Sequence, residues 1–149
     1  MYIQVTEQVI HPWSVIEDYE KTHPELAGKH GANVVFLGRM RDFNEADTIS
    51  SMQLEHYPGM TEKYLTGIAD DAMNKWQIMD ALIVHRVGTI SPADTIVVVV
   101  VWAAHRADAY EANQFIMEAL KSRAPFWKKE TLEDGQARWV EKNTPGKTQ

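Results

Sequence analysis

The sequence contains no cysteine. The chain therefore cannot form disulfides, bind zinc through thiolates or supply a thiolate or persulfide nucleophile of its own. It also lacks an apolar run of about 18 residues, the length that a membrane-spanning helix requires. The first residues, MYIQVTEQVIHPW, have neither a basic start nor a long apolar stretch, unlike a signal peptide. These absences favour a cytoplasmic protein without a membrane segment.

Positive charge is also scarce, since the formal net charge is −6. General binding to nucleic acid or to an anionic membrane is therefore not expected, and any basic cluster has to act locally. The six histidines show no HxH or HxxxH spacing, so no metal site is predicted. The motifs GxSxG, GxGxxG and the Walker loop are absent as well, and no cofactor is predicted.

The length, 149 residues, and the apolar fraction, 44%, suit one domain with its own core. We expect this domain to span residues 1–142. The last residues, NTPGKTQ, form a loose tail over residues 143–149 in this interpretation.

The pattern of apolar residues predicts a mixture of strands and helices. Strands are predicted over Tyr2–Glu7, Ala32–Leu37, Ser51–Tyr57, Ala81–Val87 and Thr95–Trp102, with a final hairpin of Phe126–Thr131 and Ala137–Val140. Helices are predicted over Thr61–Trp76 and Arg106–Ser122, and over Val15–Lys21 with Ser14 as its cap. Gly38 is expected to open a polar loop, GRMRDFNEAD, and Gly88–Pro92 to form a turn. The pattern indicates an α+β fold, with helices packed on one side of a largely antiparallel sheet.

The segment MEALKSRAPFWKKE gathers positive charge around a proline and two aromatics. In a strand that starts at Phe126, Lys128 and Glu130 share one face. A lysine that neighbouring aromatics partly desolvate has a lowered pKa and can act as a base or nucleophile. The alternative is that Lys121 only caps its helix, where a cation is favourable anyway, and that the aromatics are core.

The segment Ala104-His105-Arg106 lies where the central strand gives way to the long helix. The unpaired N–H groups of a helix N-terminus suit an anion, and His105 and Arg106 add positive charge there. The segment is thus a candidate site for a phosphate or carboxylate. The alternative is that Asp108 and Glu111 neutralise both residues locally.

A second basic segment, Gly38-Arg39-Met40-Arg41, follows a buried strand. Loops at strand ends often carry binding groups, and an arginine can grip a phosphate with two parallel hydrogen bonds. The alternative is a solvated turn in which Asp42 and Glu45 pair with the arginines.

Four motifs in the order LEHYPGMTEK, AHR, FIMEALKSRAPFWKKE and RWVE resemble the large, catalytic subunit of molybdopterin synthase. The likeness extends from Val34 to about Glu141. It implies an α/β hammerhead-type fold with a small added antiparallel β subdomain. It also implies a sulfurtransferase of molybdenum cofactor biosynthesis that converts cyclic pyranopterin monophosphate (precursor Z) into molybdopterin.

In this family the sulfur comes from the C-terminal Gly-Gly thiocarboxylate of a small ubiquitin-like subunit, which fits a chain without cysteine. The resemblance further implies a homodimer of this chain that binds the sulfur carrier as a heterotetramer. Carried over by motif, the catalytic residues are Lys121 and Lys128. The implied substrate-binding residues are Arg39, Met40, Arg41, His105, Arg106, Lys121, Lys128, Lys129 and Glu130. One departure is Asp42-Phe43, where many family members have Asn-His, so the role of position 43 is open.

Arg106 and Lys121 are fifteen residues apart on one predicted helix. At 1.5 Å per residue their backbones are roughly 22 Å apart. If both residues serve one small substrate, the simpler geometry takes them from different subunits of a symmetric dimer.

Two other classes of function remain open at this stage. A non-catalytic module could bind a phosphorylated metabolite through AHR, and it would need the arginines but neither Lys121 nor Lys128. An RNA-binding domain could use the basic clusters, with Phe126 and Trp127 stacking on bases, although the acidic total opposes it.

Overall fold

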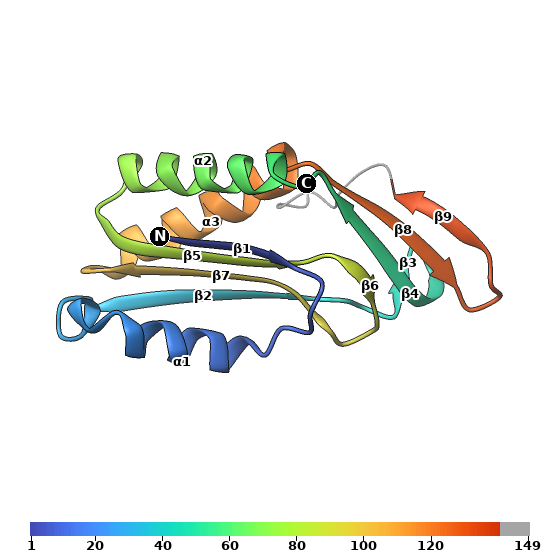
Figure 1. Cartoon of the computed structure of the whole chain (residues 1–149), viewed down its shortest axis with the longest axis horizontal. Helices are drawn as coiled ribbons and strands as arrows, with labels where there is room; N and C mark the ends of the chain where they lie inside the picture. The colour runs from blue at the N-terminus through green and yellow to red at the C-terminus, as the bar shows by residue number, and fades with distance from the viewer. Residues whose placement is uncertain (141–149) are drawn as a thin grey trace.

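The structure, a computed structural model, describes residues 1–140 as two sheets and three α-helices (Figure 1). The expected tail, residues 143–149, lies outside the described residues. The helices are α1 (Pro12–Thr22), α2 (Met60–Lys75) and α3 (Arg106–Arg123), with a short 3₁₀ helix, η1, at Pro24–Leu26. The strands are β1 (Tyr2–Thr6), β2 (Ala32–Arg39), β3 (Phe43–Asn44), β4 (Asp47–His56), β5 (Ile78–Arg86), β6 (Gly88–Ile90), β7 (Thr95–Ala103), β8 (Phe126–Leu132) and β9 (Ala137–Val140).

The larger sheet has the strand order β1-β5-β7-β2, in which only β1 and β5 run parallel. Its two inner strands, β5 and β7, are buried along most of their length because they carry apolar side chains on both faces. α2 and α3 pack on one face, and α1 packs on the other (Figure 1). The expectation that all helices lie on one side was therefore wrong, since a sheet that is apolar on both faces needs a cover on each.

The smaller sheet is antiparallel and is built around β4, which pairs with β3, β6 and β8. β9 extends it through the hairpin with β8. Its separate core consists of Met40, Ile49, Met52, Leu54, Val87 and Ile90. The α+β class, the largely antiparallel pairing and the small antiparallel β subdomain are thus confirmed.

Several predicted element boundaries were wrong. α1 begins at Pro12 without a side-chain cap from Ser14, because a proline in the first turn needs no N–H partner. The segment after Gly38 is not a loop, since β2 continues to Arg39 and a tight hairpin joins β3 to β4. The two hairpin residues, Glu45 and Ala46, have φ values of 53° and 68°, as a type I′ turn requires. Gly88–Ile90 is a short strand instead of a turn.

Candidate active site

Lys121 and Lys128 lie on either side of one sharp reversal of the chain. Lys121 is in the last turn of α3, and Lys128 is the third residue of β8. Between them, Ala124 caps the helix and Pro125 precedes the first strand residue, Phe126, since a proline disfavours helical geometry in the residue before it. β8 then runs back along β4, and both lysine side chains end up half-buried at the junction of the two sheets.

Burial sets the protonation of this lysine pair. Burial, together with the smaller effect of the charge on Lys128, lowers the pKa of Lys121 to about 8. Burial also lowers the pKa of Lys128, with the charge of Arg41 adding to the effect and that of Glu130 opposing it. Lys121 is therefore no solvated helix cap, and a lysine with a pKa of about 8 can give or take a proton near neutral pH.

A hydrogen bond from α2 holds the chain reversal between Lys121 and Lys128. The hydroxyl of Thr61, which is fully buried, donates to the carbonyl of Pro125 at 3.2 Å. The same oxygen accepts the backbone N–H of Tyr57 at 2.9 Å. Thr61, which lies within the LEHYPGMTEK motif, therefore fixes the start of β8.

The arginine segment runs close to this pair. Arg39 ends β2 and is exposed, whereas Met40 is buried in the core of the smaller sheet. The guanidinium of Arg41 lies 4.9 Å from the ring centre of Phe43, and its charge acts on Lys128. The phenylalanine at position 43 thus supports Arg41 through a cation–π contact.

Lys129 and Glu130 project from opposite faces of β8 and make different contacts. Lys129 projects to the other face of β8, with its ammonium 5.7 Å from the ring centre of Trp139. Glu130 is buried and accepts hydrogen bonds from the amide of Asn44 at 3.0 and 3.1 Å and from Nε of Arg138 at 3.2 Å. Its carboxylate ties the β3–β4 hairpin, which follows Arg41, to β8 and β9.

His105 and Arg106 lie at the opposite end of α3 from Lys121 (Figure 1). Both are exposed, and within residues 1–140 no carboxylate forms an ion pair with Arg106. Local neutralisation by Asp108 and Glu111 is therefore not observed; Glu111 instead accepts a hydrogen bond from Trp76 at 2.9 Å. Within one chain, the helix separates these two residues from the lysine pair.

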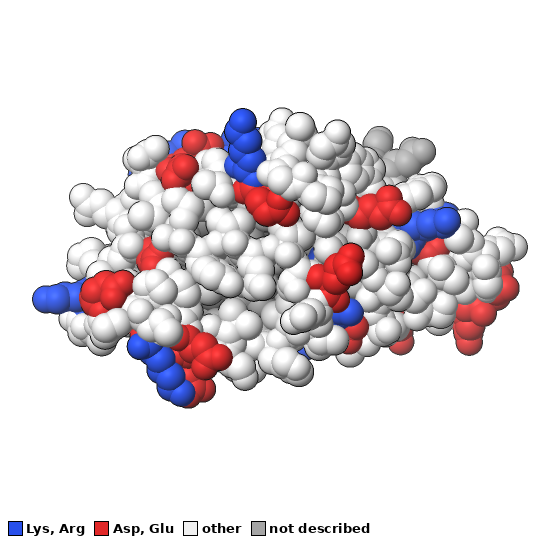
Figure 2. Space-filling model, viewed as in Figure 1, with Lys and Arg blue, Asp and Glu red and all other residues white. Residues whose placement is uncertain are grey.

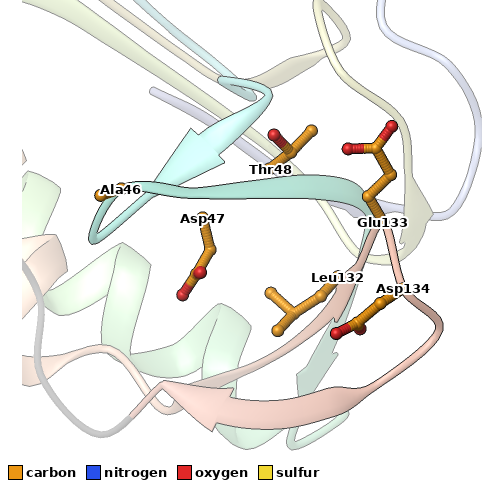
Figure 3. Close-up of a pocket in the computed structure, with 6 residues that line it drawn as sticks. All are labelled: Ala46, Asp47, Thr48, Leu132, Glu133 and Asp134. Atoms are coloured by element: carbon orange, nitrogen blue, oxygen red, sulfur yellow. The ribbon is translucent and has the colours of Figure 1, made fainter.

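Two hollows on the surface of residues 1–140 are lined by residues other than the lysine pair. One of about 410 Å³ lies between the β3–β4 turn and the β8–β9 turn, lined by Ala46, Asp47, Thr48, Leu132, Glu133 and Asp134 (Figure 3). Three of these side chains are carboxylates, so this hollow repels a phosphate. A second of about 410 Å³ lies on α2 and the end of α3. On the face shown in Figure 2, acidic and basic side chains are interspersed among uncharged ones.

One residue near the lysines had no signal in the sequence analysis. His85, on β5, is buried, and its ring stacks on that of Phe126 with centroids 3.9 Å apart. Burial lowers its pKa to about 3, and the charges of Lys121, Lys128 and His56 oppose its protonation as well. A lone histidine in an apolar strand carries no pattern that would have marked it.

Two further findings concern the described residues as a whole. Within residues 1–140, no helix combines the length and the apolarity needed to cross a membrane. The same part of the chain holds no group of three or more His, Cys, Asp or Glu side chains arranged for a metal ion.

Fold and site together define an α+β protein with a desolvated lysine pair and nearby arginines, which suits chemistry on an anionic group. The chain belongs to the MoaE family: the model of the MoaE protein matches residues 5–123. The resemblance drawn from the four sequence motifs is thereby confirmed.

Individual relatives agree with this assignment. The chain is 49% identical over 132 residues to the molybdopterin synthase catalytic subunit of Escherichia coli (strain K12), covering 87% of this chain and 85% of that protein. It is 54% identical over 111 residues to the protein of the same name from Ralstonia nicotianae, covering 74% of this chain but only 62% of that protein. Among solved structures, a molybdopterin biosynthesis MoaE protein from Burkholderia ambifaria has a TM-score of 0.78 at 41% identity, covering 97% of this chain and 92% of that one.

Proposed function

We propose that this chain is the catalytic subunit of a molybdopterin synthase and acts in molybdenum cofactor biosynthesis in the cytoplasm. It converts cyclic pyranopterin monophosphate into molybdopterin with sulfur from the C-terminal thiocarboxylate of a small ubiquitin-like subunit. Its relatives from Escherichia coli and Ralstonia nicotianae bear the name catalytic subunit, which implies at least one further subunit. The absence of cysteine supports a sulfur donor on another chain.

The observation that carries this proposal is the lysine pair. Two half-buried ammonium groups beside Arg41 form a positive, partly desolvated site, in which a thiocarboxylate or phosphate interacts more strongly than in water. Because the pKa of Lys121 is about 8, this residue can orient the anion in its charged form and exchange a proton in its neutral form. A module that only binds a phosphorylated metabolite has no use for a lysine tuned in this way.

The chemistry follows from these charges. The thiocarboxylate sulfur attacks a carbon of the pterin side chain, and a C–O bond of that side chain breaks, so that the cyclic phosphate opens or leaves. Water then cleaves the resulting thioester, which leaves the sulfur on the pterin and a carboxylate on the small subunit. A second thiocarboxylate supplies the other sulfur of the dithiolene. Arg41 stabilises negative charge that develops on the phosphate, while Lys121 and Lys128 orient the thiocarboxylate or transfer protons. Arg39 lies at the edge of the same segment and Lys129 on the far face of β8, so both are assigned to the periphery of the pocket.

His105 and Arg106 reach this site from a second copy of the chain in a symmetric dimer, to which the small subunits add to give a heterotetramer. The support is the unbroken course of α3 from Arg106 to Arg123, which separates Arg106 from Lys121 by roughly 22 Å. A phosphate that contacts both groups therefore fits between two chains better than within one.

Complementation tests the shared site. Inactive Arg106→Ala and Lys121→Ala chains are mixed under conditions in which subunits exchange. Half of the dimers are then mixed, and each contains one intact and one doubly damaged site, so activity should recover to about a quarter of wild type. If exchange is verified and activity stays at the level of the single variants, both residues act within one chain.

Substitution of the lysines tests the activity itself. Lys128→Ala should reduce product formation from cyclic pyranopterin monophosphate and the thiocarboxylated small subunit by roughly a hundredfold or more, the usual contribution of a proton-transfer group. Binding of the pterin should persist, as measured by calorimetry. The matched control is Lys63→Ala, on the exposed face of α2, which should leave turnover unchanged. Normal turnover in Lys128→Ala would remove the catalytic role of this lysine, whereas a wild-type protein that binds the pterin but forms no product would support the metabolite-binding alternative.

The RNA-binding alternative requires Phe126 and Trp127 to stack on bases, but only one of these two rings is exposed. Phe126 is half-buried and already stacked on His85, which leaves only Trp127 of the two aromatics exposed. Of the expected stacking pair, one indole in an acidic chain gives little basis for RNA binding.

A further inference from the structure

The turn that joins Lys121 to Lys128 rests on an aromatic pair that links β5 to β8. Phe126, the first residue of β8, stacks on His85 with centroids 3.9 Å apart and an interplanar angle of 16°. Lys128 follows Phe126 by two residues and therefore lies on the same face of the strand. The position of this ring consequently bears on where the ammonium of Lys128 lies.

The ring of His85 is itself fixed by a hydrogen bond. Its Nδ1–H donates to the backbone carbonyl of Arg86 at 2.8 Å, which sets the tautomer and leaves Nε2 without a proton. His85 is 2% exposed and sits in β5, an inner strand of the larger sheet. The stack therefore connects the turn between α3 and β8 to a buried inner strand of the larger sheet.

The charges around His85 show that its surroundings suit an uncharged ring. Those that act on it come from three elements: Lys121 on α3, Lys128 on β8 and His56 on β4. A protonated imidazole here would be a further buried cation beside two ammonium groups, which is strongly unfavourable. The imidazole is thus present as a neutral, flat surface next to the lysine pair.

We propose that His85 is a positioning residue for the lysine pair, because its neutral ring, stacked on Phe126, fixes the turn that sets Lys128 against Lys121. This inference rests on the proposed function, since it assigns His85 a role in the same reaction. His85 touches neither substrate in this proposal; it acts through Phe126. The aromatic ring of His85 positions Phe126, and its Nδ1–H serves only to fix the orientation of that ring.

Three substitutions separate the ring from its nitrogen. His85→Phe keeps an aromatic ring for the stack and loses the N–H, His85→Asn keeps a donor and loses the ring, and His85→Leu loses both. Turnover is measured with cyclic pyranopterin monophosphate and the thiocarboxylated small subunit. His85→Phe should stay within about threefold of wild type. His85→Leu and His85→Asn should lose roughly ten- to a hundredfold in kcat with KM for the pterin unchanged, the usual cost of a small misplacement of a reacting group.

A spectroscopic measurement distinguishes positioning from mere stability. Lysines are labelled by reductive ¹³C-methylation, and the two active-site resonances are titrated in the folded variants. In His85→Leu the titration of Lys121 should move from about 8 towards its ordinary value as the loosened turn admits water, whereas in His85→Phe it should not. A residue that only stabilises the fold would leave both titrations unchanged.

The partner ring gives a second route if the His85 variants do not fold. Phe126→Leu, with His85 intact, should show the same loss of kcat, and adding His85→Leu to it should cost little more because both changes break one contact. Phe115→Leu, which breaks the Trp76–Phe115 pair at 5.2 Å, is the control and should lower stability without lowering kcat.

Three results overturn the inference. Full turnover in both His85→Leu and Phe126→Leu shows that the stack has no role. Turnover that survives in His85→Asn but not in His85→Phe shows that the nitrogen acts instead of the ring. Additive losses in the double variant show that the two residues act separately. Failure of the proposed function itself is recognised independently, because the wild-type protein would then form no product from these two substrates.

Discussion

Replacing Lys121 by methionine should stabilise this protein while abolishing its activity. Methionine has nearly the length of lysine and keeps the apolar contacts of its stem, but it carries no charge. Lys121 holds its charge in a half-buried position beside Lys128, and that charge costs free energy in the folded state only.

The magnitude follows from the pKa. Lys121 has a pKa of about 8 in the folded protein instead of the ordinary 10.5, and each pH unit between them corresponds to about 1.4 kcal/mol. The charged side chain therefore destabilises the fold by at most about 3 kcal/mol at neutral pH. For a chain of this size, removing that penalty should raise Tm by up to about 10 °C.

The dependence on pH has a definite sign. Below about pH 8 the lysine is protonated in both the folded and the unfolded state, so the whole penalty is present. Between about pH 8 and 10.5 only the unfolded state keeps the proton, and the stability of the wild type rises towards that of Lys121→Met. Above that range the penalty is gone.

Urea unfolding at about pH 7 and about pH 10 measures this difference, at one fixed protein concentration because an oligomer makes stability concentration-dependent. Lys63→Met, at an exposed position on α2, is the control and should change stability by less than about 0.5 kcal/mol. The reasoning is refuted if Lys121→Met is less stable than wild type at pH 7, or if the gap between them does not narrow at pH 10.

Two further substitutions probe the supports of the site. Arg138→Ala removes an ion-pair partner of the buried Glu130 and should lower stability in thermal unfolding more than Arg123→Ala, which breaks an exposed pair and should cost under about 1 kcal/mol. A similar loss of stability in both variants would contradict the view that Arg138 holds the carboxylate of Glu130 in place. Gly31→Ala places a Cβ 2.3 Å from a backbone carbonyl oxygen and should cost about 1–3 kcal/mol by the same assay. Gly67→Ala, in open space on α2, should instead stabilise by roughly 0.5–1 kcal/mol, and equal effects would exclude a steric cause.

The larger sheet was predictable because its strand residues form patterns that fit few other structures. Thr95–Trp102 is apolar on both faces, which indicated an inner strand, and it forms most of β7. The amphipathic helices α2 and α3 were predicted within one residue of their observed ends. What the pattern could not show was how many layers would form, since α1 covers its face of the sheet through only a few apolar contacts.

The motifs pointed to Lys121 and Lys128 as candidate site residues, but their environment could not be predicted. A lysine at a helix end is normally solvated, and the burial of Lys121 depends on β8 folding back over β4. The same tertiary contact turns Glu130 inward and brings Phe126 onto His85. These contacts join residues that are far apart in the sequence, so no local spacing could reveal them.

The double hydrogen bond of Thr61 makes distant segments open and close together. Its hydroxyl joins the start of α2 to the start of β8, and α2 cannot fray at its first turn without releasing the carbonyl of Pro125. The amide of Tyr57 and those at the beginning of β8 should therefore exchange their hydrogens through one shared opening event. Opening of this hydrogen bond should therefore disturb the arrangement of the lysine pair in one step, in the fraction of molecules that occupy the open form.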